Sequence, residues 1–511
     1  MPDKIIVTNE SALKAKYQVA GLTAIKAAIQ KLIAADLRRG LKSVSIALDN
    51  AASMKKAGGK AVVTPTDPKQ NKDAIDAIFK KFAPHYLLIL GAPDVVPHQD
   101  MQNPVYSATG EDTDKIAFGD IPYACEKPYS KKPEDFIGPT RVVGRVPDLV
   151  NSKDVKYLIG VLKTAADYQQ RKTSDYDSYF GVSAAVWKNS TALSLKHAFG
   201  SNADLQLVPP KTEQWSKNLI SRLGHFINCH GGDTDTHYYG QLRQTYPHAL
   251  DASLLKGKIS EGTVAAAECC YGAQLYDPAL AQGQPGICNM YLGEKAYGFF
   301  GSTTTAYGMP TGNSAADLIC QFFMKLVIHG ASLGRATLQA RQEFAKSSHH
   351  ISPTDLKTLA QFNLLGDPSL VPVASQNPQP KGLAAAAGLA ECGDRRRQLK
   401  TEGISITLHN PVARSTKTSK PQPAMQKQLD ALSKKGGLHK PVTLSFSIKH
   451  PAGASKLMGK AMTAKSPPAD SFHVLMGKTK TKGAPVPHVK VLVAKVSAGK
   501  IVSVQELHRK S

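Results

Sequence analysis

Short apolar runs alternate with helix-forming segments through residues 1–372, and this alternation restricts the fold more than any other feature of the chain. Residues 22–40 (LTAIKAAIQKLIAADLRRG) carry apolar side chains at helical spacing and end on a glycine. Residues 85–91 (HYLLILG) are too apolar for an exposed edge strand. The rhythm predicts an α/β fold: a mostly parallel sheet flanked by helices on both faces.

The pattern changes after residue 372. Residues 373–400 are rich in proline, alanine and arginine and are typical of a linker. Beyond them, strand-like runs follow one another without helices: 403–410, 442–450, 472–477 and a hairpin around SAGK at 497–500. Residues 415–428 are expected to form a flexible basic loop. We therefore predict an N-terminal α/β subdomain (1–150), a second α/β subdomain (151–372), the linker (373–400), and a small basic β-rich module (401–511).

Positive charge is concentrated in the C-terminal part of the chain. Residues 376–511 hold 24 Lys and Arg against 6 Asp and Glu, which is +18 of the net charge of +24. Such a segment is either a solvated surface or a surface that attracts nucleic acid, anionic lipid or an acidic protein. It has few aromatic side chains for base stacking, which argues against single-stranded nucleic acid.

Targeting signals and disulfide patterns are absent from the sequence. No apolar run approaches the ~18 residues of a membrane span, and the first residues lack a signal-peptide core. The seven cysteines are scattered and form no CxxC pair. We expect a cytoplasmic protein without a membrane span, with export by an unrecognised route left open.

Two of the expected strands end in reactive residues. Residues 226–232 (FINCHGG) place His230 and two glycines after an apolar run, and residues 264–272 (VAAAECCYG) place Cys269 and Cys270 after another. Ligands and catalytic groups gather at the carboxyl ends of strands in parallel sheets. An imidazole beside a thiol can activate it as a nucleophile, and glycines leave backbone N–H groups free to face an oxyanion.

The order of these motifs resembles that of the caspase-like cysteine peptidases, and the longer match resembles their gingipain-type branch. The pieces are HYLLILGAPDVVPHQD, TRVVGRVP, NCHGG, ECCYGAQ, YGFFGSTTTAYG, SLGRATLQAR and FNLLGDPSL. The resemblance implies a caspase/gingipain-like sheet and a cysteine endopeptidase that hydrolyses polypeptides through a Cys-His dyad and an acyl-enzyme. It implies no cofactor and no metal.

The resemblance also implies roles for individual residues. His230 matches the catalytic histidine, and Gly231 would lend its N–H to the oxyanion hole. The expected nucleophile is Cys270, because CYG fits caspase spacing and ECC is similar to some metacaspases. Cys269 is the alternative, in a legumain-like register. Ser302 and Tyr307 match the wall of the substrate pocket.

One departure from the family concerns specificity. Gingipains that cleave after Arg or Lys need an acid in the primary pocket, expected here from residues 187–200 (WKNSTALSLKHAFG), which contain no Asp or Glu. Either Asp233, Asp235 or another acid supplies it, or Lys188 lines the pocket and favours an acidic or neutral residue.

Two further interpretations stay open at this point. The chain could be a catalytically silent caspase-like scaffold whose basic tail docks an anionic partner. Alternatively, Cys229, His230, Cys269 and Cys270, with His225 or His237 nearby, could bind zinc. Adjacent cysteines on a strand face opposite ways and chelate poorly, which disfavours zinc.

Overall fold

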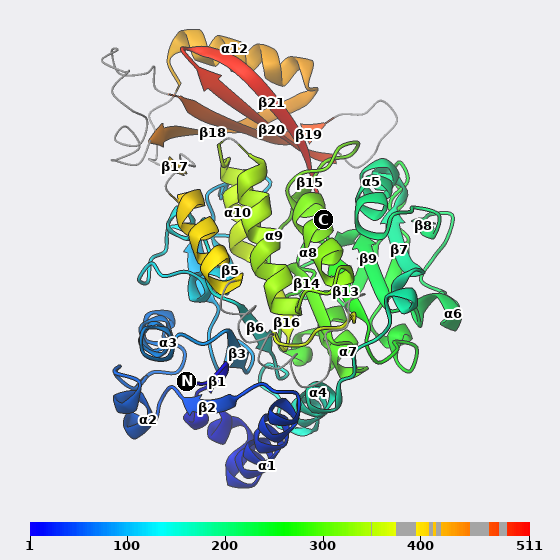
Figure 1. Cartoon of the computed structure of the whole chain (residues 1–511). Helices are drawn as coiled ribbons and strands as arrows, with labels where there is room; N and C mark the ends of the chain where they lie inside the picture. Colours follow the sequence, from blue (N-terminus) through cyan, green and yellow to red (C-terminus); the bar gives the residue numbers. More distant parts are fainter. Residues whose placement is uncertain are drawn as a thin grey trace.

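A ten-stranded sheet forms the centre of the molecule in this computed structural model, which describes residues 1–348, 350–374, 395–407, 412–414, 421–449, 470–479 and 488–510 (Figure 1). In spatial order, the strands are β2 (Ser43–Ala47), β1 (Lys4–Thr8), β3 (Tyr86–Leu90), β6 (Val143–Val146), β16 (Phe362–Gly366), β14 (Gly298–Ser302), β13 (Val264–Ala267), β9 (Gly224–Asn228), β7 (Tyr179–Ala184) and β8 (Leu205–Val208).

The sheet consists of two parallel blocks. Strands β2, β1, β3, β6 and β16 run one way, and β14, β13, β9, β7 and β8 run the other way. The blocks meet where β14 pairs antiparallel with β16, with Phe300 opposite Leu364. The prediction of a mostly parallel α/β sheet is confirmed, and the antiparallel junction is a feature that the alternating pattern does not encode.

Helices cover the sheet, so that β1, β3, β9, β13 and β14 are buried along their whole length. One group packs α1 (Glu10–Arg38) on α4 (Lys156–Asp167) and α4 on α7 (Ile287–Gly293). A second group packs α8 (Ala316–Ile328) between α5 (Lys188–Phe199) and α9 (Leu333–Ser347). Other helices include α3 (Pro68–Phe82) and α10 (Pro353–Gln361).

A second, antiparallel sheet of six strands lies near the C-terminus, as the expected β-rich module requires. Its order is β15 (Tyr307–Gly308), β21 (Lys500–Arg509), β20 (His488–Ser497), β19 (Ser471–Thr479), β18 (Leu438–Lys449) and β17 (Val412–Arg414). Helix α12 (Pro423–Lys435) covers one face through Leu429. Val105 and Tyr307, from earlier in the chain, pack against the other face.

The predicted hairpin is present, whereas two other local predictions are wrong. Ser497 pairs with Lys500 across Ala498 and Gly499, which both have positive φ (51° and 74°), as a tight two-residue turn requires. Residues 395–407 form a helix, so the strand expected from residue 403 is incorrect within the described residues. Leu399 and Ile406, seven residues apart, are its buried hydrophobic side chains.

The expected flexible loop at 415–428 is also partly helical. Residues 423–428 begin α12, and the proline at its first position favours a helix start. Residues 415–420 lie outside the described part of the chain.

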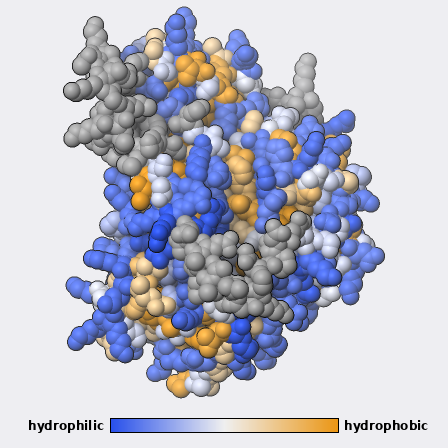
Figure 2. All heavy atoms as spheres, in the orientation of Figure 1, coloured by the Kyte–Doolittle hydropathy of each residue, from blue (hydrophilic) through white to orange (hydrophobic). Residues whose placement is uncertain are grey.

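Hydrophilic residues dominate the face of the molecule shown in Figure 2, and apolar residues appear there in separate groups. Among the described residues, none of the helices combines the length and the apolar character needed to cross a bilayer. In Figure 1, β21 descends from the C-terminal sheet toward the ends of β13 and β14. The end of β21 therefore lies beside His230 and Cys270.

Candidate active site

His230 and Cys270 stand at the same level of the large sheet, on the ends of neighbouring strands. Ala267 of β13 lies opposite Ile227 of β9 in a parallel pair, and each reactive residue follows three positions later. The backbones approach closely here, since a Cβ on Gly231 would lie 2.0 Å from the carbonyl oxygen of Cys270. Gly231 therefore allows the two strand ends to meet.

Gln241 fixes the orientation of the His230 ring. The Nε2 atom of His230 lies 2.7 Å from Oε1 of Gln241. The amide nitrogen of Gln241 donates to the carbonyl of Arg243 and the hydroxyl of Tyr246, so its oxygen is the atom that faces the ring. An amide oxygen only accepts, hence Nε2 carries the proton of the neutral imidazole and Nδ1 is the basic nitrogen.

The two adjacent cysteines have different surroundings. Burial raises the pKa of both thiols, and that of Cys269 lies well above its ordinary value. For Cys270, the guanidinium of Arg509 acts in the opposite direction. The Sγ of Cys270 accepts from the N–H of Ala306 at 3.1 Å. Ser302 donates to the carbonyl of Cys269 at 2.8 Å and so holds the turn that carries both cysteines.

The last described residues of the chain lie inside this site. Strand β21 pairs antiparallel with β15, placing Arg509 opposite Tyr307. The N–H of Lys510 then donates to the carbonyl of Ala306 at 3.0 Å. The carbonyl oxygen of Lys510 accepts from two backbone N–H groups, those of Gly231 and Cys270, each at 3.2 Å. Two convergent N–H groups on one carbonyl oxygen form the geometry of an oxyanion hole.

A closed acidic pocket holds the side chain of Lys510, which is fully buried. Its Nζ donates to Asp317 at 2.5 Å, Asn228 at 2.6 Å and Glu268 at 2.9 Å. The ring of Trp187 lies 5.0 Å from the same nitrogen, within cation–π range.

The charges of this pocket depend on one another. Burial alone would lower the pKa of the Lys510 ammonium, but Asp317 and Glu268 together raise it above its ordinary value. Burial raises the pKa of the Glu268 carboxyl well above its usual range, against the opposing effect of Lys510. Both acids accept from the Lys510 ammonium, and burial disfavours the charged form of Glu268.

Gly308 makes room for the lysine. A Cβ at this position would lie 2.1 Å from Cε and 2.6 Å from Nζ of Lys510, and 2.7 Å from Oδ2 of Asp317. Asp317 is held in place because its Oδ2 accepts from the N–H of Met309 at 2.7 Å. The pocket is therefore shaped by a missing side chain as well as by charges.

Ser302, Tyr307 and Lys188, the residues predicted to line the substrate pocket, do not contact the ammonium of Lys510 through any hydrogen bond or ion pair found in the described residues. Tyr307 lies beside Arg509 in the strand pair, and Ser302 lies under the cysteine turn. Lys188 is exposed at the start of α5, and the neighbouring Trp187 is the side chain of this segment that contacts Lys510. The acids are Glu268 and Asp317, which lie outside segment 187–200, the segment that matches the source of the pocket acid in gingipains and that contains no Asp or Glu here.

The two other acids suggested for the pocket have different partners. Asp235 accepts from the hydroxyl of Tyr239 at 2.8 Å, and Asp233 accepts from the amide of Gln274 at 2.6 Å. Sequence reasoning did not identify Gln241, Asn228 or Asp317. Glu268 was visible, directly after a buried strand and two residues before Cys270, but its position carried no assigned role.

The central part of the chain matches a known protein family. Residues 223–373 match the model of Peptidase family C25, and this segment contains His230, Cys270 and the pocket acids. The protein is a cysteine peptidase, and this segment is similar to the gingipain family. It is therefore a hydrolase whose substrates are polypeptides.

Two further comparisons give no additional information about function. A solved structure described as "Structure of Protease" covers 99% of this peptidase and 96% of its own chain, with 13% identity and a TM-score of 0.47. No curated protein matches the sequence.

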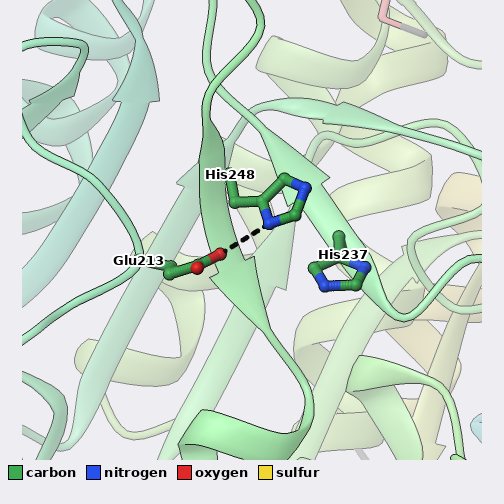
Figure 3. Close-up of side chains that lie close together, drawn as sticks. All are labelled: Glu213, His237 and His248. Atoms are coloured by element: carbon green, nitrogen blue, oxygen red, sulfur yellow. Dashed lines mark ion pairs between the residues drawn. The ribbon is translucent and has the colours of Figure 1, made fainter.

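A group of potential metal ligands includes two histidines on the strands that follow His230 of the peptidase. Glu213, His237 and His248 each offer a ligand atom, and these atoms lie within 4.8 Å of one another (Figure 3). His237 belongs to β11 (His237–Tyr239) and His248 to β12 (His248–Asp251), and β11 also pairs with β10 (His230–Gly231). His248 is ion-paired to Glu213 at 2.9 Å.

Proposed function

We propose that this peptidase is an endopeptidase that cleaves after lysine through a Cys270–His230 dyad and an acyl-enzyme. The single observation that carries the proposal is the position of Lys510. Its ammonium fills the acidic pocket while its carbonyl oxygen accepts from Gly231 and Cys270. A bound substrate would present the residue before the scissile bond in the same way.

The chemistry follows from the groups around that carbonyl. Nδ1 of His230 takes the proton of the Cys270 thiol, and the thiolate attacks the carbonyl carbon. The negative charge that develops on the oxygen is stabilised by the N–H groups of Gly231 and Cys270. The C–N bond breaks, and the imidazolium returns its proton to the leaving amine. Water then hydrolyses the thioester, giving a carboxylate and the free thiol.

The pocket supports lysine over other residues at the cleaved position. Three acceptor oxygens, from Asn228, Glu268 and Asp317, surround one ammonium nitrogen at 2.5–2.9 Å. A buried carboxylate without a cationic partner is costly, so a neutral or acidic side chain would bind less well. The earlier suggestion that Lys188 favours an acidic residue finds no support in these contacts.

The test is hydrolysis of fluorogenic peptides that differ only in the cleaved residue, using the wild-type chain and Lys510→Ala. We expect release after lysine, abolished by Cys270→Ala, with iodoacetamide modifying Cys270 faster than Cys269. If neither chain cleaves any peptide in a library and all cysteines react slowly and alike, the proposal fails. The silent scaffold with a basic, partner-docking module then becomes the better interpretation.

A further inference from the structure

We propose that the C-terminal strand β21 is a tethered, substrate-like inhibitor of the chain's own active site. This inference rests on the proposed function and concerns the regulation of the same site. In this structure, the side chain of Lys510 occupies the acidic pocket, and its carbonyl oxygen accepts from the oxyanion-hole N–H groups of Gly231 and Cys270. The peptidase is therefore latent until Arg509 and Lys510 leave.

The strand fills each part of the site that a peptide substrate would need. Its backbone pairs with β15 through Arg509 and His508, its last described carbonyl faces Cys270, and its lysine is fully buried. Arg509 also donates to the carbonyl of Glu111 at 2.5 Å, beyond the pocket. No second peptide can pair with β15 while β21 is bound to it.

The rest of the module holds the strand in place. The opposite edge of β21 pairs with β20 along its length, from Lys500 to His508. Leu507 is buried in the cluster that joins the module to Val105 and Tyr307 of the catalytic unit. The strand is thus fixed between β15 and β20. Removing it would leave β15 as a free edge, the usual acceptor for an extended peptide.

The charge of the strand matches the pocket that it fills. In a chain with many surface lysines, Lys510 is the one whose ammonium contacts Asn228, Glu268 and Asp317. Breaking a buried charge pair typically weakens binding by about 100-fold. Loss of the Lys510 side chain should therefore favour the open state strongly.

The experiment compares hydrolysis of a lysyl peptide by the wild type, Lys510→Ala and Lys500→Ala. Lys500 is exposed at the other end of β21 and serves as the matched control. We expect Lys510→Ala to raise kcat/KM about 100-fold, with Lys500→Ala equal to the wild type. A synthetic peptide of residues 500–510 should then inhibit the Lys510→Ala chain competitively. The same peptide with alanine at its last position should not inhibit it.

The outcomes separate this inference from the proposed function. Equal and substantial activity of the wild type and Lys510→Ala would overturn the inference and leave the peptidase function intact. Inactivity of both towards every peptide would instead overturn the proposed function. If Lys510→Ala unfolds, the peptide arm is carried out on the wild type, where failure of residues 500–510 to slow residual hydrolysis or labelling of Cys270 would overturn the inference.

A second, independent observation concerns Glu213, His237 and His248. We propose that these residues bind a zinc ion. Two imidazoles and one carboxylate are a ligand set that zinc favours, and nitrogen ligands disfavour calcium. Asp235 and Asp251 lie 3.3 Å from the two ring nitrogens of His237, so either nitrogen has a carboxylate to orient it when the other coordinates.

An ion at this position would connect segments that are separate in the chain. Glu213 follows β8 in the chain, whereas the two histidines belong to β11 and β12, so one ion would tie separate segments together (Figure 3). Their rings already lie 4.2 Å apart between centroids. Small movements of the exposed His248 would bring all three ligands onto one ion.

Zinc titration of the full chain by calorimetry tests this site. We expect one zinc site that is lost in His237→Ala and His248→Ala and kept in His329→Ala, which removes an exposed histidine elsewhere. Zinc should also raise the Tm of the wild type in a concentration-dependent way, since the ion binds the folded state. Unchanged zinc stoichiometry and affinity in His248→Ala would refute the site.

Discussion

The reactive pair, His230 and Cys270, and the acidic pocket that holds Lys510 are built in different ways. His230 and Cys270 come from equivalent positions at the ends of two neighbouring parallel strands. The pocket gathers Asn228, Glu268 and Asp317 from β9, the end of β13 and α8, with space left by Gly308 of β15. The reactive pair is thus a local product of strand pairing, whereas the pocket depends on the packing of several elements.

This difference predicts two kinds of mutational effect. Changes in the reactive pair should slow hydrolysis of all substrates equally, because the bond-breaking steps are common to them. Changes in the pocket should alter the preference between a peptide with lysine at the cleaved position and one with norleucine, its neutral analogue. The measurements below use chains that also carry Lys510→Ala, so that the internal lysine does not compete.

The largest effect is expected for Cys270→Ala. Removing the nucleophile should lower kcat by about 10⁴-fold or more for both peptides. Cys269→Ala is the matched control and should retain activity within about threefold, since Cys269 is a buried thiol of raised pKa. Loss of activity in Cys269→Ala with survival in Cys270→Ala would reverse the assignment of the nucleophile.

Gly308→Ala should have the next largest effect. The added Cβ would lie 2.1 Å from Cε of a bound lysine, and the ion pairs to the pocket prevent that side chain from moving aside. We expect kcat/KM to fall about 100- to 1000-fold for the lysyl peptide and also to fall for norleucine, because space is removed for both. An unchanged rate for either peptide would show that the pocket relaxes.

Asp317→Asn should affect lysine alone. Breaking a buried charge pair costs about 3 kcal/mol, so kcat/KM for the lysyl peptide should fall about 100-fold while norleucine changes little. Glu268→Gln is the control: burial raises the pKa of the Glu268 carboxyl and so disfavours its charged form, and the change should cost under about threefold. If kcat/KM for the lysyl peptide falls more in Glu268→Gln than in Asp317→Asn, the negative charge of the pocket lies on Glu268 and not on Asp317.

The smallest effect is expected for Gln241→Ala. The variant removes the acceptor that orients Nε2 of His230, and kcat should fall about tenfold for both peptides alike. Gln241→Glu keeps an acceptor but adds a negative charge, which stabilises the imidazolium and should move the acidic limb of the pH profile upward. An unaltered pH profile would argue that Gln241 does not act on this ring.

The reactive pair could be predicted from the sequence because each member directly follows a short apolar run. Strand periodicity, the glycines and the 40-residue spacing sufficed to place His230 and Cys270 at one edge of a parallel sheet. The choice between Cys269 and Cys270 rested on motif spacing. In the structure the N–H of Cys270 contacts the Lys510 carbonyl, which supports Cys270.

The pocket acids could not be predicted in the same way. Asp317 lies in the first turn of an amphipathic helix, where an acid is common because it complements the helix dipole. Nothing local to SAADLICQFF distinguishes it from such an acid. Its role arises from the packing of α8 beside β13, and that packing brings together residues 49 positions apart in the chain (Glu268 and Asp317).

The C-terminal module shows the same limit. Its hairpin was evident from alternating apolar residues around SAGK, but charge counts described the basic residues only as a group. That one of these lysines pairs with acids of the same chain follows from where β21 ends, which composition does not encode. The error at 395–407 occurred where a short apolar pattern fits a helix and a strand about equally. The loop over 415–428 was expected because that segment is polar and basic, but residues 423–428 begin α12.

The two-residue turn between β20 and β21 affects the equilibrium between the bound and the released C-terminal strand. It keeps Lys510 beside the pocket at a local concentration that, for a short tether, is of millimolar order. Dilution therefore cannot release the strand, as it would release a separate inhibitor protein. A free peptide must exceed this local concentration or bind much more tightly. Events that separate β21 from β20 would act as the switch, because they lower the local concentration without changing a single contact of the pocket.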